Sequence, residues 1–362
     1  MRLRRPPQVA QPRVAPDDPN SPALLAPRFP RLAARGGRPV SSALVRLSLL
    51  LLAGEGSAAA GWRGEPPLPR ALAGAAAAST GDAGWIVGGT WWEAERKQVG
   101  TALYRCASGQ TTWSIAGELP GGFAHGGFAG DGQTLWLAGG MTRTGVSAQV
   151  LRLDLAAGRA TEFAHLGEPR VYCGAALLAG ALWVIGGTPA ESDLSRADGA
   201  AWRVDLSTGT VSALPPGPPW INPLVLALDG RLHVLPGGVW VPARGRLEPP
   251  TRVAVYHPAE RRWETRPLPQ PLPRGLAGVA LDGNRAFLAG GVELRGVTPA
   301  ITRATWLYRG DHGSLAPLPP LPAPRLAAMV LRTDEGLLVL GGEDRPRGRA
   351  ATVWRLAGKD LP

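Results

Sequence analysis

A short apolar run that ends in two glycines recurs six times along the chain. The pairs end at Gly89, Gly140, Gly187, Gly238, Gly291 and Gly342, so the successive spacings are 51, 47, 51, 53 and 51 residues. Apolar runs of this length, bounded by glycines, are typical of strands covered on both faces. The repeat of about 50 residues therefore predicts an array of small supersecondary units rather than two conventional domains.

Each unit contains runs long enough for four strands, except the last. Residues 325–332, 336–342 and 352–358 read as three strands, and the chain then ends. The segment GWRGEPPLPR at residues 61–70 has the form of the missing fourth strand, as seen in TTWSIAGELP at residues 111–120. We therefore predict that residues 61–65 pair beside residues 352–356 and close the array into a ring, which removes its open ends.

The period and the paired glycines resemble the kelch family from about residue 61 to the end of the chain. That resemblance implies an all-β fold, a six-bladed kelch-type β-propeller whose ring is closed by the N-terminal strand. In antiparallel blades, the loops that follow the glycine pairs lie on the same face as the connections between blades. These loops are the long ones, as in residues 90–100 and 188–199, so we expect the functional site on that face.

Composition narrows the classes of partner. The net charge is +11, but residues 1–46 hold nine Arg and two Asp, which is +7, so the rest of the chain carries only +4. Only Lys97 and Lys359 are lysines, and no basic cluster alternates with aromatic residues in the repeats. The 49 Gly and 37 Pro recur in register, which indicates turns rather than disorder. The sequence thus argues against nucleic-acid binding.

The N-terminal region divides into two predicted parts. Residues 1–42 are rich in Pro, Arg and Ala without periodicity, which predicts a disordered leader. Residues 43–60 contain a basic residue, a Leu-rich core and small residues, the layout of a secretory signal peptide too short to span a bilayer. This predicts a protein exported to the periplasm or secreted, free of the membrane after cleavage. The alternative is a disordered tail with a chance run of leucines.

Residues that could hold a metal or cofactor do not form a recognisable set. Cys106 and Cys173 fall in different predicted blades, which favours two small unpaired apolar residues over a disulfide. The histidines show no metal-ligand spacing and no cysteine pair suggests zinc. A copper oxidase built on kelch blades needs converging His and Tyr ligands, but the tyrosines fall on predicted strands. We expect neither a metal nor a cofactor. The histidines are His125, His165, His233, His257 and His312, and the tyrosines Tyr104, Tyr172, Tyr256 and Tyr308.

Arginine recurs where each innermost strand begins. Aligning the units on the position after each Pro-rich passage gives Arg70, Gly122, Arg170, Trp220, Arg274 and Arg325. Four guanidinium groups at the channel mouth would repel one another and would favour an anionic guest, since Arg binds carboxylates with two parallel hydrogen bonds. We therefore predict these arginines as substrate-binding residues. The alternative is that each one hydrogen-bonds carbonyl groups of a neighbouring loop.

The last unit contains the most specific motif, the sequence GEDRPRGR at residues 342–349. It resembles the sialic acid mutarotase (N-acetylneuraminate epimerase) branch of the kelch propellers. In that branch a Glu directly after the second-strand glycine and an Arg six residues later form the catalytic site, which implies Glu343 and Arg349. The segment GGTWWE at residues 88–93 is similar to the cyclically permuted members. Departures are Gly122 and Trp220, where Arg is usual, the PGG of the fourth unit, and the additional Arg345 and Arg347.

The chemistry of the pair fits that reaction without the resemblance. Mutarotation opens and recloses a sugar ring, which requires a group that takes the anomeric proton and returns one to the ring oxygen. A carboxylate can exchange these roles, whereas Arg keeps its proton and holds an anion. The sequence predicts a cofactor-free isomerase acting on a small sugar acid. Two alternatives stay open: an exposed ion pair in a charged loop, and a non-catalytic module that binds a glycan or protein. The oligomeric state is not predicted.

Overall fold

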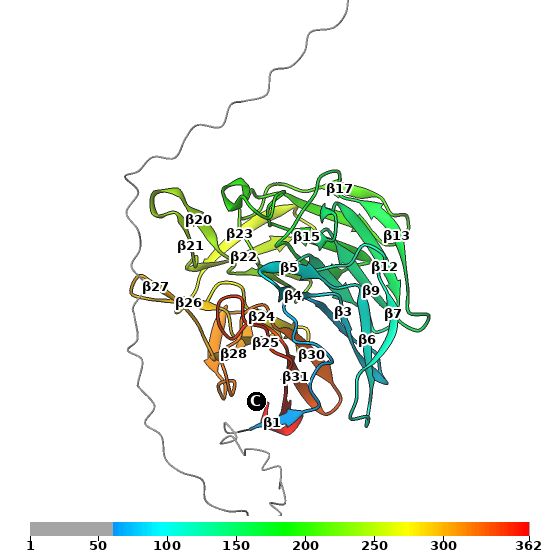
Figure 1. The fold of residues 1–362 in the computed structure, drawn as a ribbon. Coiled ribbons are helices and arrows are strands. Elements are labelled where there is room, and N and C mark those ends of the chain that lie inside the picture. The colour runs from blue at the N-terminus through cyan, green and yellow to red at the C-terminus, as the bar shows by residue number, and fades with distance from the viewer. Residues whose placement is uncertain (1–60, 362) are drawn as a thin grey trace, which may run out of the picture. The chain divides into compact units, whose positions relative to one another are not determined.

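Each repeat forms one four-stranded antiparallel sheet, and six such sheets form a β-propeller in the computed structural model, which describes residues 61–361 (Figure 1). The predicted leader at residues 1–42 and signal peptide at residues 43–60 lie outside the described residues. Blades 1 to 3, from the innermost strand outward, consist of β2 (Ala76–Ser79), β3 (Ala83–Val87), β6 (Ala102–Ala107) and β7 (Ser114–Glu118); β8 (Gly127–Gly130), β9 (Thr134–Ala138), β12 (Gln149–Asp154) and β13 (Arg159–His165); and β14 (Gly174–Leu178), β15 (Ala181–Ile185), β16 (Ala201–Asp205) and β17 (Val211–Ala213).

Blades 4 to 6 follow the same plan. They consist of β18 (Leu224–Leu228), β19 (Arg231–Leu235), β22 (Arg252–His257) and β23 (Arg262–Pro267); β24 (Ala277–Ala280), β25 (Arg285–Ala289), β28 (Thr305–Arg309) and β29 (Ser314–Pro317); and β30 (Met329–Thr333), β31 (Gly336–Leu340), β32 (Val353–Ala357) and β1 (Trp62–Glu65). Short 3-10 turns occur at η1 (Leu194–Arg196), η2 (Pro242–Arg244) and η3 (Gly358–Asp360). Among residues 61–361, no helical segment has the length and apolar character of a membrane span.

The ring closes through its N-terminal strand, which confirms the prediction made from the missing fourth strand. β1 pairs antiparallel with β32, with Trp62 opposite Leu356 and Glu65 opposite Val353. Figure 1 shows β1, in blue, beside the red C-terminal strand. Trp62 is 3% exposed and packs with Phe287 of blade 5, while its indole nitrogen donates to Pro319 O at 2.9 Å. Residues 61–65 therefore complete the sheet of blade 6, and Trp62 completes the hydrophobic core between blades 5 and 6.

The core is divided among the interfaces between blades, which explains the continuous apolar runs. Alternate residues of a strand point to opposite faces. In β9, Leu135 and Leu137 pack against blade 1, whereas Trp136 and Ala138 pack against blade 3. Because neighbouring blades cover both faces of these strands, neither face carries a row of polar side chains.

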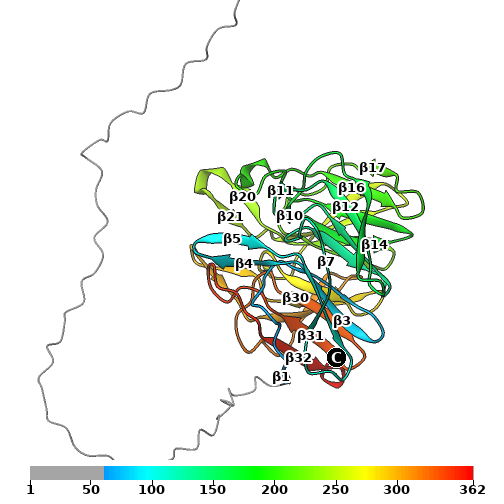
Figure 2. The same ribbon diagram turned by 45° about the vertical axis from the view of Figure 1, so that its right-hand side comes forward.

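Four of the long loops fold into hairpins directly after the glycine pairs. They are β4 (Thr90–Glu93) with β5 (Arg96–Val99), β10 (Met141–Thr142) with β11 (Gly145–Val146), β20 (Val239–Val241) with β21 (Arg246–Glu248), and β26 (Val292–Arg295) with β27 (Thr298–Ile301). Figure 2 shows β4–β5 and β20–β21 projecting on one side of the ring. These hairpins build the walls of the predicted functional face.

His233 makes the stability of the fold dependent on pH. It is fully buried in β19, with Nδ1 3.0 Å from the Tyr308 hydroxyl. Burial lowers its pKa from 6.5 to about 4, aided by the charges of Arg266 and Arg231. Between these values the unfolded chain binds more protons than the folded one. The free energy of unfolding should therefore fall as pH drops from 6.5 to 4, by up to about 3 kcal/mol from this residue.

Urea denaturation at several pH values measures this effect. His233→Gln lacks the titrating ring, so its unfolding free energy should fall less steeply with pH in that window, whatever its absolute stability. Equal slopes for the variant and the parent would contradict the assignment.

Candidate functional site

The paired glycines fix the position of the loops at the channel mouth. A side chain at Gly88 would collide with the carbonyl oxygen of Phe123 in the next blade, and both Gly88 and Gly89 have positive φ. The N–H of Gly89 donates to that carbonyl at 2.8 Å, and Gly342 makes the same contact with Leu72 O at 2.7 Å. Glycine is required because the neighbouring backbone approaches this closely. The unusual fourth pair, Gly237 and Gly238, does not adopt positive φ.

Glu343 is held at the mouth by its own backbone. It directly follows Gly342, and its N–H donates to Leu326 O at 2.7 Å while its carbonyl accepts from Leu326 N at 2.9 Å. These two bonds form an isolated bridge to the start of the innermost strand of blade 6. The side chain is 18% exposed. The motif therefore places a carboxylate that is largely buried but accessible.

Arg349 pairs with Glu343, as the motif predicts. Its Nη1 lies 3.0 Å from Glu343 Oε1, and the Arg349 side chain is 6% exposed. The guanidinium also donates to Thr90 O at 3.1 Å, to the Thr90 hydroxyl at 3.2 Å and to Gly348 O at 2.9 Å. These bonds tie blade 6 to blade 1 and leave the remaining N–H groups for Glu343 and a bound oxygen.

Burial sets the protonation behaviour of the pair. Removal from water raises the pKa of Glu343, and the charges of Arg349 and Lys97 only partly offset this effect. Burial likewise lowers the pKa of Arg349, against the influence of Glu343. A carboxyl group with a raised pKa can both accept and return a proton near neutral pH more readily than a solvated one. The pair is thus more than an exposed ion pair in a charged loop.

The β4–β5 hairpin makes further contacts beside the Glu343–Arg349 pair. Lys97 Nζ of β5 lies 2.5 Å from Glu191 Oε1 in the loop of blade 3. This ion pair connects blades 1 and 3 across the mouth, past blade 2. Arg347 Nη1 lies 2.5 Å from Glu95 Oε2 at the hairpin turn. The Arg347 guanidinium also lies over the Trp92 ring at 5.0 Å. These contacts connect the loops of blades 1, 3 and 6 beside Glu343.

Each blade also contributes one residue in the left-handed conformation to the mouth. These six residues, hereafter the mouth ring, are Gly74, His125, Tyr172, Asn222, Gly275 and Ala327. Successive members are joined by backbone hydrogen bonds: Gly74 N to Ala327 O, His125 N to Gly74 O, Tyr172 N to His125 O and Asn222 N to Tyr172 O, at 2.6–2.9 Å. In the described residues, no such bond joins Gly275 to its neighbours. The ring carries three polar side chains, of which His125 and Asn222 line the channel.

His125 and Tyr172 are the site residues that the sequence did not reveal. His125 Nε2 lies 3.4 Å from the Thr90 hydroxyl, and its ring packs edge-on against Tyr172 with 5.4 Å between centroids. Burial lowers the His125 pKa to about 3, with help from Lys97 and Arg349. Burial also raises the pKa of Tyr172, as do the charges of Glu191 and Glu343. Both groups are therefore neutral at physiological pH.

The prediction that all four tyrosines lie on strands is wrong for Tyr172. It lies in the turn before β14 with φ of +58°, because the innermost strand begins at Gly174, four residues after Arg170, where the sequence pattern placed its start. A signal was present: aligned correctly, this position holds Gly, His, Tyr, Asn, Gly and Ala, and Gly, Asn and His are the residue types enriched at positive φ.

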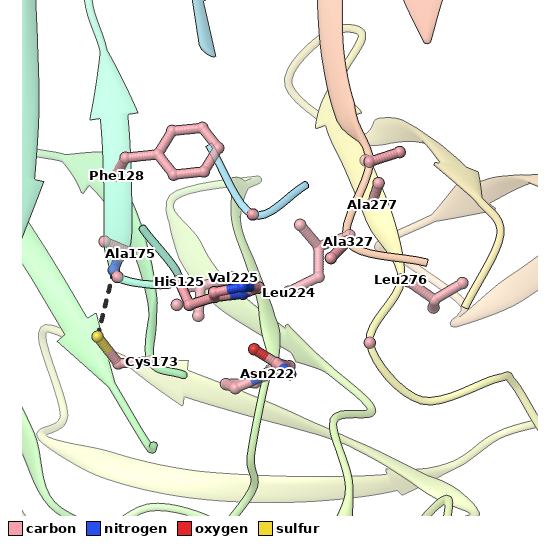
Figure 3. A pocket seen from close by; sticks show the side chains of 18 of the residues that line it. His125, Phe128, Cys173, Ala175, Asn222, Leu224, Val225, Leu276, Ala277 and Ala327 are labelled. Atoms are coloured by element: carbon pink, nitrogen blue, oxygen red, sulfur yellow. Dashed lines mark hydrogen bonds between the residues drawn. The ribbon is translucent and has the colours of Figure 1, made fainter. Parts of the chain in front are cut away.

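The channel behind the mouth ring is a cavity of about 170 Å³. Figure 3 shows His125 and Asn222 among its lining side chains, with Phe128, Val225 and Leu276 as apolar wall. The dashed line in that view is the bond from Gly127 N to Cys173 Sγ, 3.2 Å long. Cys173 is buried and Cys106 half-buried, and both thiols are free. Within residues 61–361, no group of three or more potential ligands could hold a metal ion.

The four predicted arginines do not share one structural position. Arg170 and Arg325 are equivalent, since their carbonyls accept from Gly140 N and Gly291 N, but Phe123 and Leu72 occupy that position in blades 2 and 1. The predicted alignment was therefore shifted in the units of Arg70 and Arg274. The length of the Pro-rich passage differs between units, which displaces such an alignment.

Two of these arginines are buried, and their guanidinium groups contact other side chains of the propeller. Arg170 is completely buried, pairs with Glu168 and Asp198, and lies over the Trp202 ring. Arg325 is 3% exposed, lies 4.1 Å from the Trp354 ring centroid and donates to Thr352 Oγ1 and Pro324 O.

The other two differ from this pair and from each other. Arg70 is 45% exposed and pairs with Glu93 at 3.2 Å, over the Trp91 ring. Arg274 is half-buried, and burial lowers its pKa. Among the described residues, Arg274 has no carboxylate within ion-pair distance and its Nε is buried without a hydrogen-bond partner. Arg325 likewise has no carboxylate within ion-pair distance in this part of the chain, but it is buried, so Arg274 is the more accessible of the two unpaired guanidinium groups.

Gly74→Ala is expected to disturb the mouth through His125. An added Cβ would collide with the imidazole ring, and Gly74 has φ of +66°. Alanine in this conformation costs about 1 kcal/mol by itself, and the displaced ring should bring the total loss of unfolding free energy to about 2–3 kcal/mol. Urea denaturation of Gly74→Ala, His125→Ala and the double variant forms a double-mutant cycle. The cost of Gly74→Ala should shrink when His125 is already Ala. A cost that is independent of His125 would contradict this.

Comparison with known proteins supports the architecture. No protein-family model matches the sequence, and no curated protein matches it either. Among solved structures, that of YjhT is similar, with a TM-score of 0.62 and 15% sequence identity, over 80% of this chain and 95% of YjhT. At this identity the similarity establishes the fold alone, a six-bladed β-propeller.

Proposed function

We propose that the protein is a mutarotase that interconverts the anomers of a sugar acid such as N-acetylneuraminate. The observation that carries the proposal is the largely buried Glu343–Arg349 pair, 3.0 Å apart, at the end of the propeller channel. Similarity to a propeller structure supplies only a scaffold, on which many functions occur. The residue types and their burial supply the chemistry.

Glu343 acts as the proton-transfer group in this proposal. Its carboxylate takes the proton of the anomeric hydroxyl and a proton is delivered to the ring oxygen. The bond between the anomeric carbon and the ring oxygen then breaks and leaves an open-chain ketone. Rotation of the ketone and the reverse transfer close the ring on the other face. No proton, electron or atom is gained or lost overall, so the reaction needs no cofactor.

Arg349 stabilises negative charge in the same step. Its guanidinium is held by Thr90 and Gly348, so it faces the developing oxyanion without reorganising. Arg274 supplies a second cation for the carboxylate of the substrate, because among the described residues it has no carboxylate partner and it is less buried than Arg325. In this proposal Arg170 and Arg325 stabilise the propeller and do not bind substrate. Arg70 lies at the exposed edge of the mouth.

The direct test follows the anomers by proton NMR. α-N-acetylneuraminate released from a glycoside relaxes toward the β form in buffer. The parent protein should accelerate this relaxation in proportion to its concentration while leaving the final ratio unchanged. No acceleration with any sialic acid would reject the enzyme and favour the non-catalytic binding module.

A further inference from the structure

The mouth ring is chemically asymmetric. Blades 2, 3 and 4 place His125, Tyr172 and Asn222 in it, whereas blades 5, 6 and 1 place Gly275, Ala327 and Gly74. All six make the same left-handed turn. The turn alone therefore does not require large polar side chains on one half of the mouth.

Tyr172 is the residue that the backbone least favours at this position. A bulky aromatic side chain is uncommon at positive φ, whereas Gly adopts it freely and Asn tolerates it. Strained backbone of this kind concentrates at binding and active sites, where surrounding structure holds it in place. The neighbouring blades show that a small residue would serve the fold.

The polar side-chain groups of His125, Tyr172 and Asn222 are almost free of hydrogen bonds within the described part of the protein. In residues 61–361, no hydrogen bond engages the side chain of Tyr172 or Asn222, and neither side chain has a fully buried polar atom without a partner. Their donors and acceptors are therefore still accessible. His125 has a single long contact, to Thr90.

All three groups are also neutral. His125 is held unprotonated and Tyr172 protonated by burial, and Asn carries no charge. The ion pair of Glu343 and Arg349 lies beyond them, toward blades 6 and 1. Neutral donors and acceptors of this kind suit the neutral hydroxyl groups of a ligand, whereas the cations that act on His125, Lys97 and Arg349, lie outside the three.

We infer that His125, Tyr172 and Asn222 form a subsite for the uncharged, hydroxyl-rich side chain of a sugar acid, which rests on the proposed function of Glu343 and Arg349. The ligand that this subsite favours is thus a sugar acid with a free polyhydroxyl tail. Tyr172 and Asn222 donate to and accept from the tail hydroxyls, while Glu343 works at the anomeric carbon.

Binding of an unreactive ligand tests the subsite separately from catalysis. The probe is the 2-O-methyl glycoside of N-acetylneuraminate, whose ring cannot open, and the comparison ligand is the same glycoside with its glycerol tail oxidatively shortened. Calorimetry measures both dissociation constants for the parent, Tyr172→Phe and Asn222→Gly. The matched control is Ala327→Gly, which changes the same turn on the apolar half of the ring.

The parent should bind the full glycoside more tightly than the shortened one. Tyr172→Phe and Asn222→Gly should each weaken binding of the full glycoside about three- to tenfold, the range for a neutral hydrogen bond, and leave the shortened one nearly unchanged. Ala327→Gly should affect neither. Equal losses for both ligands, or no loss, would overturn the subsite. Tyr172→Phe removes only a hydroxyl, so it decides the matter if Asn222→Gly does not fold.

The outcomes also separate the two proposals. If the parent distinguishes the glycosides but does not accelerate mutarotation, the subsite stands and the proposed function fails. If mutarotation is accelerated but the variants bind like the parent, the subsite fails and the function stands. If the parent binds neither glycoside, both fail.

Discussion

Glu343→Gln is expected to slow the interconversion of sugar-acid anomers by about a hundredfold or more, the usual contribution of a positioned proton-transfer group. Glutamine keeps the shape of the side chain but cannot take a proton. The equilibrium ratio of anomers should not change. Relaxation of the α anomer, followed by proton NMR at equal concentrations of variant and parent, gives the ratio of rates.

The neighbouring residue offers a control for this variant. Asp344 lies on the same loop and pairs with Arg345 at 3.2 Å, so Asp344→Asn removes a carboxylate without touching the proposed chemistry and should keep the parent rate. The parent rate should also fall with acid at a pH above 4.5, because burial raises the pKa of Glu343. If Glu343→Gln equilibrates the anomers as fast as the parent, Glu343 is not the proton-transfer group.

Trp62→Ala is expected to lower the free energy of unfolding by about 3–5 kcal/mol, the usual cost of emptying a buried aromatic site. Trp62 is 3% exposed, packs with Phe287 and donates to Pro319 O. Its removal opens a cavity at the point where the ring closes. Urea denaturation monitored by circular dichroism measures the change.

Arg63→Ala is the matched control on the same strand. Arg63 is 62% exposed and pairs with the exposed Glu335 and with Glu65, which keeps its ion pair with Arg355, so the change should stay below about 1 kcal/mol. Deleting residues 61–65 should be worse than either substitution, since it uncovers the edge of β32. A deletion variant as stable as the parent would show that the ring does not depend on β1.

The architecture was accessible from the sequence because its physical causes are local. Strands covered on both faces must be apolar throughout, as in β9, and the neighbouring carbonyl at Gly88 excludes any side chain there. Both requirements recur once per blade, so the apolar runs and the glycine pairs recur in the sequence about every 50 residues. Counting the strand-length runs in each unit also showed that the last unit lacks its fourth strand.

The site was only partly accessible because it depends on contacts between blades. Glu343 and Arg349 lie six residues apart and could be found as a motif. The residues around that pair, Thr90, His125 and Tyr172, come from three other blades and share no sequence pattern with it. In blade 3 the innermost strand begins at Gly174 and not at Arg170, which leaves Tyr172 in a turn. In blade 1 a separate shift of two residues placed Arg70, in place of Leu72, at the position of Arg325.

Pairing of β1 with β32 also governs the order in which the chain can fold during synthesis. Arg355 Nε and Glu65 Oε1, 2.6 Å apart, come from residues separated by 290 positions. Among the described strands, β1 is synthesised first, and it remains without its partner until β32 has emerged from the ribosome. Blades 1 to 5 can form in turn, but blade 6 cannot be completed before β32 is synthesised. Its last step is a closure between distant segments, which is slow and leaves an unpaired edge exposed to aggregation meanwhile.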